Sequence, residues 1–471
     1  MASKPTKYQL DILQKMSKGV DVNKALTTGY DIDPETMTGG SALRTEFLAP
    51  RLTQLSYSAD QMIFYNRVPK MPSSSVVAQY VTFNQHGETG HTAWNNEEDI
   101  SDQKDVDITR GEVRMKYAST TRQVSLISQA VDNIQQPIQV LTDDAMVSLA
   151  KSIEQGSLYG DSDLTDGALG SGLEPNGLAK LIPESNVIDN RGEDISVKNF
   201  QDASVKIVKA YGTPTDAFMP TGVLANFNND HGDVQRQLIG QSSNQINLGV
   251  NIPQVTTVGG TIRLDGSNVM ENDNILNESR LGGQGAPGMP NVTAKVNTNG
   301  GGKFLADEVS AGTSYKVVVY ADKSGSLATD DIPVSLANTT DSVTLTINVL
   351  ASFQDTPKYV AIYRKGVTSG YYYQIARIGM NQKVANGKYN TITFTDTNDN
   401  MPETVDVFVG DMSPETIRLY ELLPMFRLPL PSFNKMLTWA CVWSGGLALI
   451  APHRWVRIKN VGYTPVYPNN N

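Results

Sequence analysis

The sequence predicts an α+β body that is interrupted by an inserted all-β sandwich. Apolar side chains recur every three or four positions from Ile127 to Ile153, which is the spacing of one face of a long helix. Short alternating segments follow one another between residues 292 and 396, as is typical of a sandwich. The chain on either side of 286–402 mixes helix and strand patterns. Because neither flank is self-sufficient, we expect both to form one discontinuous body.

Composition narrows the functional class. The 471 residues are 39% hydrophobic and 19% charged, which argues against wholesale disorder, and the net charge of −10 argues against a protein that grips nucleic acid over most of its surface. The single cysteine, Cys441, excludes an internal disulfide framework and is expected to be a small buried hydrophobe. We predict no membrane segment, since the longest uncharged stretch, 436–452, contains Gly445-Gly446 and is interpreted as two β-segments around a glycine turn.

The N-terminal part predicts an arm and a long hairpin. Residues 1–60 begin polar and lysine-rich, as expected of an arm that becomes ordered only against another surface. Alternating segments at 79–83 and 112–128 flank residues 97–107, which hold six acids and one lysine. We therefore predict an extended β-hairpin over 75–126 whose tip is too polar to pack on its own domain.

Two helices follow. Proline is tolerated at the first position of a helix, so the long helix is predicted to run from Pro137 to Tyr159 and to stop at the Gly-Asp-Ser-Asp turn. Ser196 is typical of a helix N-cap, and Gly212 with Pro214 is typical of a helix stop. The side chains expected to face inward from this second helix are Phe200, Ala203, Ile207 and Tyr211. A short buried strand (216–220) and a short helix come next.

After a Gly/Pro linker at 278–291, the pattern changes to short strands separated by turns. The expected strands are 292–296, 314–321, 342–349, 358–365, 371–378 and 390–396. Among them, the Tyr371-Tyr372-Tyr373 run must expose at least one ring, because successive side chains point to opposite faces of a strand.

The sequence contains no phosphate-binding loop, no hydrolase nucleophile elbow and no zinc-protease motif. His86 and His91 with Glu88 are the only local cluster that could bind a metal or transfer protons, and their spacing matches no helix face, so a solvated or subunit-contact role is favoured. The tryptophans Trp439, Trp443 and Trp455 are interpreted as core or subunit packing. We therefore predict no catalytic, cofactor-binding or metal-binding residue.

Residues 396–400 invite a calcium-loop interpretation, because Asp396, Asn398 and Asn400 alternate as cation ligands do in such loops. However, Met401 stands where that loop needs glycine, and Val407 stands where it needs glutamate. An ordinary Asp/Asn-rich turn is the better interpretation.

The order of these parts resembles the major capsid proteins of tailed bacteriophages with the Hong Kong 97-type fold. The similarity depends on SLYGDSD at 157–163, NVIDNRGEDIS at 186–196 and LALIAPHRWVRIKNV at 447–461. Length and the lysine-rich start are most similar to the large myovirus capsid proteins of phages of Gram-positive bacteria. The inserted module resembles a fibronectin type III or immunoglobulin-like domain without the antibody-type cysteine pair.

The resemblance implies domain boundaries. Residues 1–60 would be the N-terminal arm. Residues 61–197 and 447–471 would form the peripheral domain, including the extended loop 75–126 and a spine helix at 137–159. Residues 198–285 and 403–446 would form the axial domain, and 286–402 the inserted sandwich.

The resemblance also implies a function. Such a protein self-assembles into hexamers and pentamers of an icosahedral head that encloses double-stranded DNA without sequence-specific binding. It meets portal, scaffolding and decoration proteins, is assembled in the host bacterial cytoplasm, ends in the virion, and is neither an enzyme nor a membrane protein. Charge predicts contacts between an acidic hairpin tip and basic surface on a neighbour. The candidates are Glu97, Glu98, Asp99, Arg418, Arg427, Arg454 and Arg457.

Two other classes stay open from the sequence alone. One is a tail-associated or host-surface adhesin with the sandwich as its binding unit. The other, weaker, is a polysaccharide-degrading enzyme that uses the acids at 97–107. Within the capsid interpretation, the sandwich is either an outward module for decoration or host contact, or a wedge that stabilises the capsomer.

Overall fold

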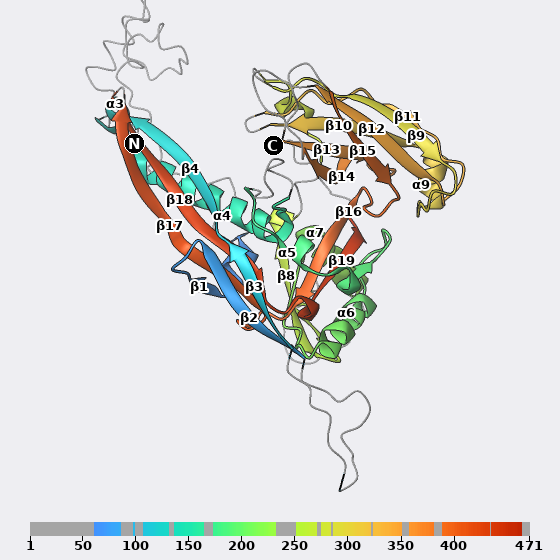
Figure 1. Cartoon of the computed structure of the whole chain (residues 1–471), viewed down its shortest axis with the longest axis horizontal. Coiled ribbons are helices and arrows are strands. Elements are labelled where there is room, and N and C mark those ends of the chain that lie inside the picture. Colours follow the sequence, from blue (N-terminus) through green and yellow to red (C-terminus); the bar gives the residue numbers. More distant parts are fainter. Residues whose placement is uncertain are drawn as a thin grey trace, which may run out of the picture. The chain divides into compact units, whose positions relative to one another are not determined.

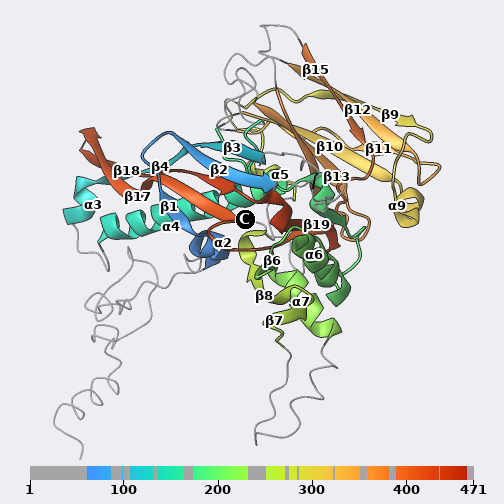
Figure 2. The same cartoon turned by 60° about the horizontal axis from the view of Figure 1, so that its bottom comes forward.

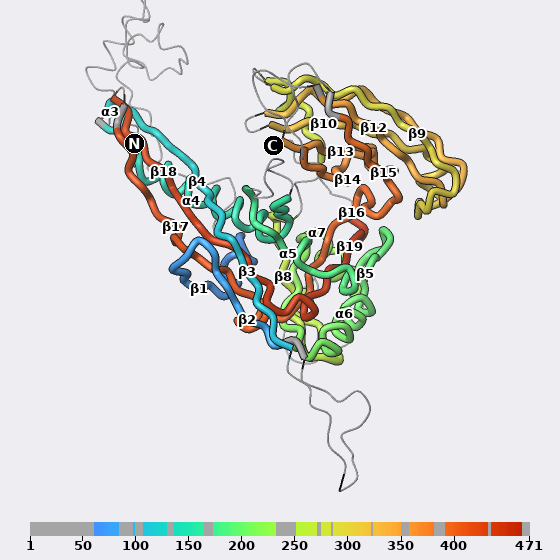
Figure 3. The backbone as a smooth tube through the Cα atoms, in the orientation of Figure 1, coloured from blue at the N-terminus to red at the C-terminus, as the bar shows by residue number. Residues whose placement is uncertain are grey.

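The computed structural model describes residues 61–85, 98, 107–130, 136–163, 173–231, 251–270, 275–283, 286–321, 324–350, 358–380, 389–433 and 435–463, and Figure 3 traces their path. The predicted arm (1–60), the cluster of His86, Glu88 and His91, and the acidic residues Glu97 and Asp99 lie outside these ranges.

A long helix beside a four-stranded sheet forms one part of the body (Figure 1). The sheet order is β1 (Lys70–Pro72), β17 (Ile417–Phe433), β18 (Met436–Leu449) and β4 (Lys116–Ser125). Helix α4 spans Pro137–Tyr159, as predicted, and we call it the spine helix. Its inward face joins the tryptophans of β18 in one core. Ile127 lies instead on a separate short helix, α3 (Leu126–Ala130), and is 75% exposed.

The predicted turn at Gly445-Gly446 is wrong, because both glycines lie inside the continuous strand β18. A Cβ atom at Gly445 would stand 2.6 Å from the Tyr420 carbonyl oxygen and 2.5 Å from the Trp443 ring. The glycine is therefore required by close packing within the sheet, a requirement that the local sequence does not distinguish from a turn.

A six-stranded sheet forms the second part of the body, and helices α6 (Val197–Lys209) and α7 (Thr221–Asp230) lie against it (Figure 2). The strand order is β5 (Val187–Asp189), β19 (Trp455–Gly462), β16 (Thr404–Gly410), β6 (Asp216–Pro220), β8 (Gly260–Ser267) and β7 (Gln254–Thr257). Ser196 is the N-cap residue of α6 as predicted, and its N–H donates to the side-chain oxygen of Asn199 at 3.0 Å.

One inward-facing prediction for α6 is wrong. Phe200, Ala203 and Ile207 are buried, but Tyr211 is 91% exposed. It follows the end of the helix with φ of +58°, a left-handed conformation that turns its side chain off the helix face. The 3.6-residue period could not show this, because the helix had already ended at Lys209.

The sheets divide the chain differently from the predicted domain boundaries. Strand β18, most of which was expected in the axial domain, pairs with β17 on one side and with β4 of the hairpin region on the other. Strand β19, expected in the peripheral domain, pairs with β16 and β5. Strands β18 and β19 are both apolar, and the alternation of side chains along a strand does not specify which strand it pairs with.

Residues 291–396 form the predicted sandwich. One sheet has the order β11 (Ile332–Val334), β10 (Thr313–Tyr320), β13 (Tyr359–Lys365) and β14 (Tyr372–Gly379), and the other has β15 (Tyr389–Asp396), β12 (Ser342–Leu350) and β9 (Asn291–Asn297). Aliphatic side chains of both sheets share one core. Along β14, Tyr372 is partly exposed and Tyr373 is buried, and Tyr371, which precedes the strand, is 45% exposed, so the tyrosine run exposes at least one ring as predicted.

Short elements complete the described chain. They are α2 (Ile63–Arg67), α5 (Leu178–Leu181), α9 (Ala306–Ala311), η4 (Glu184–Asn186), η5 (Asn268–Met270), η6 (Glu278–Arg280), η7 (Pro452–Arg454), β2 (Val77–Gln85) and β3 (Asp107–Arg114).

Candidate assembly surface

Strands β2 and β3 form a separate two-stranded antiparallel ribbon, which is the predicted hairpin in a shorter form. Of the predicted second segment, 112–128, only the part up to Arg114 belongs to the ribbon, because β4 pairs with β18 in the four-stranded sheet. Thr82 and Thr109 face each other across it, with their hydroxyl oxygens 2.8 Å apart. The Tyr80 ring lies over Gly111, where a Cβ atom would come within 2.4 Å of the ring. The ribbon therefore has a defined register, although two strands alone are marginally stable in water.

The base of the ribbon packs against the four-stranded sheet. Ala78 and Met115 are buried against Tyr420 and Ala448 of the four-stranded sheet. Beyond this contact, the ribbon depends on its own cross-strand pairs within the described chain.

One face of the ribbon carries three exposed apolar side chains. Val81 is 63% exposed, Phe83 is 53% exposed and Ile108 is 58% exposed. Phe83 and Ile108 are directly paired across the strands, which makes these side chains one continuous patch. We call Val81, Phe83 and Ile108 the hairpin patch. Clustered exposed apolar residues on a ribbon of marginal stability indicate a surface that another protein covers.

Of the acids at 97–107, the structure describes Glu98 and Asp107, and both are exposed. The predicted basic partners of the acidic tip fall into two groups. Arg427 is exposed and its guanidinium lies 4.8 Å from the centre of the Trp439 ring, while Arg418 is half-buried and donates to the Pro414 carbonyl oxygen. These two arginines have no carboxylate partner among the described residues.

Arg454 and Arg457 are engaged within the chain. Arg457 donates to Asp406 at 2.8 Å, and the Arg454 Nε donates to the Ala210 carbonyl oxygen at 3.4 Å. The sequence could not separate the two groups, since each arginine follows an apolar strand segment in the same way.

Sequence reasoning missed a buried polar network in the sandwich. Arg364 has no exposed surface, and it donates to Asp396 at 2.6 Å, to Glu308 at 3.1 Å and to Asn398. Burial and the neighbouring Asp396 carboxylate raise the pKa of Tyr315, whose hydroxyl donates to the same carboxylate. Two of the three residues considered for a calcium loop, Asp396 and Asn398, are therefore partners of a buried arginine, and Asn400 donates to the Ile375 carbonyl oxygen.

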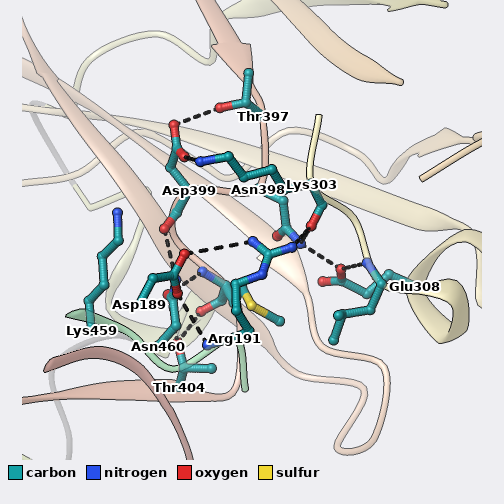
Figure 4. Close-up of polar contacts among 12 residues, drawn as sticks. Asp189, Arg191, Lys303, Glu308, Thr397, Asn398, Asp399, Thr404, Lys459 and Asn460 are labelled. Carbon is teal, nitrogen blue, oxygen red and sulfur yellow. Dashed lines mark hydrogen bonds and ion pairs between the residues drawn. The ribbon is translucent and has the colours of Figure 1, made fainter. Parts of the chain in front are cut away.

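A second network joins the sandwich to the body (Figure 4). The Asn460 amide donates to Asp189 at 2.7 Å and to the Asp399 carbonyl oxygen at 2.9 Å, and its oxygen accepts the Met401 N–H at 3.0 Å. Arg191 donates to the Lys303 carbonyl oxygen. Asn460, a buried residue of β19, therefore bonds both to Asp189 of the body and to the backbone at Asp399 and Met401, which follows the last strand of the sandwich.

Across the described ranges, no group of three or more His, Cys, Asp or Glu side chains is arranged to hold a metal ion. Burial raises the pKa of the Cys441 thiol, which disfavours the reactive thiolate. The tryptophans Trp439, Trp443 and Trp455 are buried in the core, as one of the two interpretations expected. No helix in the described ranges is long and apolar enough to cross a membrane.

Comparison with known proteins identifies the family of the whole chain. No protein-family model matches the sequence. The major capsid protein of Staphylococcus phage K is 43% identical over 446 residues, which cover 95% of this chain and 96% of that protein. The putative major capsid protein of Enterococcus phage phiEF24C is 42% identical over 461 residues, covering 98% and 97%. The chain belongs to the bacteriophage major capsid proteins. This confirms the resemblance predicted from the sequence and gives no support to the adhesin alternative.

Solved capsid structures can be aligned with most of this capsid protein, but their sequence identity to it is low. The match to the capsid of a native GTA particle covers 92% of this chain and 100% of that capsid chain, with 9% identity and a TM-score of 0.46. The capsid of Myoviridae phage XM1 covers 90% and 99%, with 7% identity and a TM-score of 0.44. Because these scores are low, the family assignment depends on the sequence relatives, and the α+β class depends on the helices and sheets described above.

Proposed function

We propose that copies of this chain assemble through hexamers and pentamers into an icosahedral head shell of the Hong Kong 97 type, which encloses double-stranded phage DNA. The observation that carries the proposal is the exposed hairpin patch, on a ribbon whose base packs against the four-stranded sheet. A neighbouring copy that lies under this ribbon would cover it, and the same contact repeats around a closed ring.

The free energy expected from covering the hairpin patch suits such a shell. Burying a whole Val, Ile or Phe side chain contributes about 1.5–3 kcal/mol, and roughly half of each hairpin-patch side chain is still exposed. Each ribbon would therefore gain about 2–4 kcal/mol from a neighbour. A single contact of this size is weak, but a closed shell repeats it in every subunit, so no covalent link is needed.

Charge would select the partner and its register. The acidic residues Glu97, Glu98 and Asp99 would face Arg427 and Arg418 of a neighbour, which have no carboxylate partner among the described residues. Arg454 and Arg457 are bonded within the chain and would serve this contact less.

The acidic balance of the chain fits a container that does not clasp its DNA. In this role the protein is structural rather than catalytic. It would meet portal, scaffolding and decoration proteins, assemble in the host cytoplasm and remain in the virion.

The first test makes the hairpin patch polar. We expect the Val81→Ser, Phe83→Ser and Ile108→Ser triple variant to keep its Trp fluorescence and thermal transition but to form no closed particles in negative-stain electron micrographs. The control is Val367→Ser, which alters a 42%-exposed valine in a sandwich turn and should leave assembly normal. Normal heads from the triple variant would refute the role of the hairpin patch.

The second test reverses the charge of the tip. Replacing Glu97, Glu98 and Asp99 by lysine should leave the subunit folded and block closed-shell formation, because like charges would then meet Arg427. Asp307→Lys with Asp330→Lys reverses exposed acids of the sandwich and is the matched control. If the tip variant assembled as the control does, the acidic tip would have no part in partner choice.

A further inference from the structure

A buried carboxyl group occupies the joint between the spine helix and the first described helix of the chain. Glu154 lies on α4 with no exposed surface. Its Oε1 accepts a hydrogen bond from the Ser267 hydroxyl, at the end of β8, at 3.1 Å. Its Oε2 is buried and has no hydrogen-bond partner within the described chain.

The third element at this joint is α2, whose N-terminus has no cap of its own. Its N-cap residue is Met62, which has no side-chain acceptor for the free N–H groups of the first turn. The first helical bond comes only at Asn66, whose N–H donates to the Met62 carbonyl oxygen at 3.1 Å. The N–H groups of Phe64 and Tyr65 are directed at Glu154 and favour its ionised form, but they leave Oε2 unbonded.

Among the described residues, no cation is paired with this carboxyl group. Arg67 of α2 is paired with Asp216 at 2.6 Å and with Asp265. The charged groups beside Tyr65 are Lys70, whose Nζ lies 3.6 Å from the centre of its ring, and Glu421, which accepts from its hydroxyl at 3.4 Å. On α4 itself, Lys151 is half-exposed one turn earlier. Ionised Glu154 would therefore be a buried charge without an ion-pair partner, which is costly.

Burial accordingly raises the pKa of Glu154 from 4.5 to about 7, against the weaker opposite effects of Ser267 and the two amides. The sign follows from linkage. A group whose pKa is higher in the closed joint than in water binds more protons when the joint is closed. Closure is then favoured fully below about pH 4.5, and this advantage is lost as the pH rises to about 7.

We propose that the joint of α2, the spine helix and η5 is a proton-coupled hinge, in which closing takes up one proton on Glu154 and opening releases it to water. Because α2 directly follows the predicted N-terminal arm, the hinge sets how firmly that end of the chain is attached to the spine helix. This device is independent of the hairpin contact and goes beyond shell formation.

Hydrogen exchange of the amides from 62 to 68 in the purified full-length protein measures the opening. Each rate is divided by the intrinsic rate at the same pH. In the wild type, the protection factor should fall by up to about tenfold per pH unit between pH 5 and 7 and then level off. Glu154→Gln stays neutral, so its protection should not change with pH over this range. Asp143→Asn, an exposed acid on the same helix, should behave as the wild type.

Ser267→Ala gives an independent readout if Glu154→Gln does not fold. It removes the hydroxyl bond that favours the ionised form, so the pH at which protection levels off should move upward. A wild-type profile that is flat between pH 5 and 7, or a Ser267→Ala profile that does not move, would overturn the hinge.

Discussion

The buried arginine of the sandwich gives the sharpest stability prediction. Replacing Arg364 by leucine removes the donors to Asp396 and Glu308 and leaves two carboxylates buried, with 3% and 6% of their side chains exposed. Breaking a buried ion pair from one side costs about 3–5 kcal/mol, because the remaining charge has lost its partner. Leucine also loses the contact of the guanidinium with the Phe304 ring, 5.2 Å from its centre.

That cost is a large part of the stability of an ordinary domain, which is about 5–15 kcal/mol. We therefore expect the sandwich of Arg364→Leu to unfold before the rest of the chain. The tryptophans lie at 94, 439, 443 and 455, outside the inserted module, so Trp fluorescence during denaturation reports on the body alone. Hydrogen exchange of β10 and β12 reports on the sandwich.

The expected result is a lower denaturant midpoint for β10 and β12, with the Trp transition unchanged. Lys295→Leu, on the exposed side of β9, is the matched control and should change stability by less than about 0.5 kcal/mol. Adding Glu308→Gln and Asp396→Asn to Arg364→Leu should recover part of the loss, because the unpaired charges are then removed. A loss below about 1 kcal/mol in Arg364→Leu would contradict this reasoning.

Two further substitutions test the body, both by Trp-monitored denaturation. Tyr211→Gly should stabilise the body by about 1 kcal/mol, because glycine adopts the left-handed conformation at φ of +58° without steric cost. Tyr211→Ala also removes the ring but should give no such gain, and equal effects of the two substitutions would exclude backbone strain as the cause. Gly410→Ala should cost more than about 3 kcal/mol, because its Cβ would stand 2.1 Å from the Trp455 ring, whereas Gly283→Ala, with nothing within 4 Å, should be neutral. A stable Gly410→Ala variant would mean that the Trp455 ring can move aside.

The sequence predicted features whose causes are local. The start of the spine helix at Pro137 follows from the tolerance of proline at the first helical position, and Ser196 is a residue type preferred at the N-cap, where it stands in α6. The strands of the sandwich were found because period-two alternation and turn residues are both local signals. The hairpin was found in the same way, and the family resemblance came from short segments in their order along the chain.

Tertiary structure alone decided which strands become neighbours. The pairing of β18 with β4 and of β19 with β16 joins residues far apart in sequence, and several registers satisfy the same alternation. It also decided which polar groups are buried. Arg364 meets Glu308 and Asp396 only when the two sheets close, and Glu154 loses water only when α2 and β8 pack against the spine helix. Burial and bonding partners depend on the whole fold, so neither the ion pairs of Arg364 nor the raised pKa of Glu154 could be inferred from the sequence.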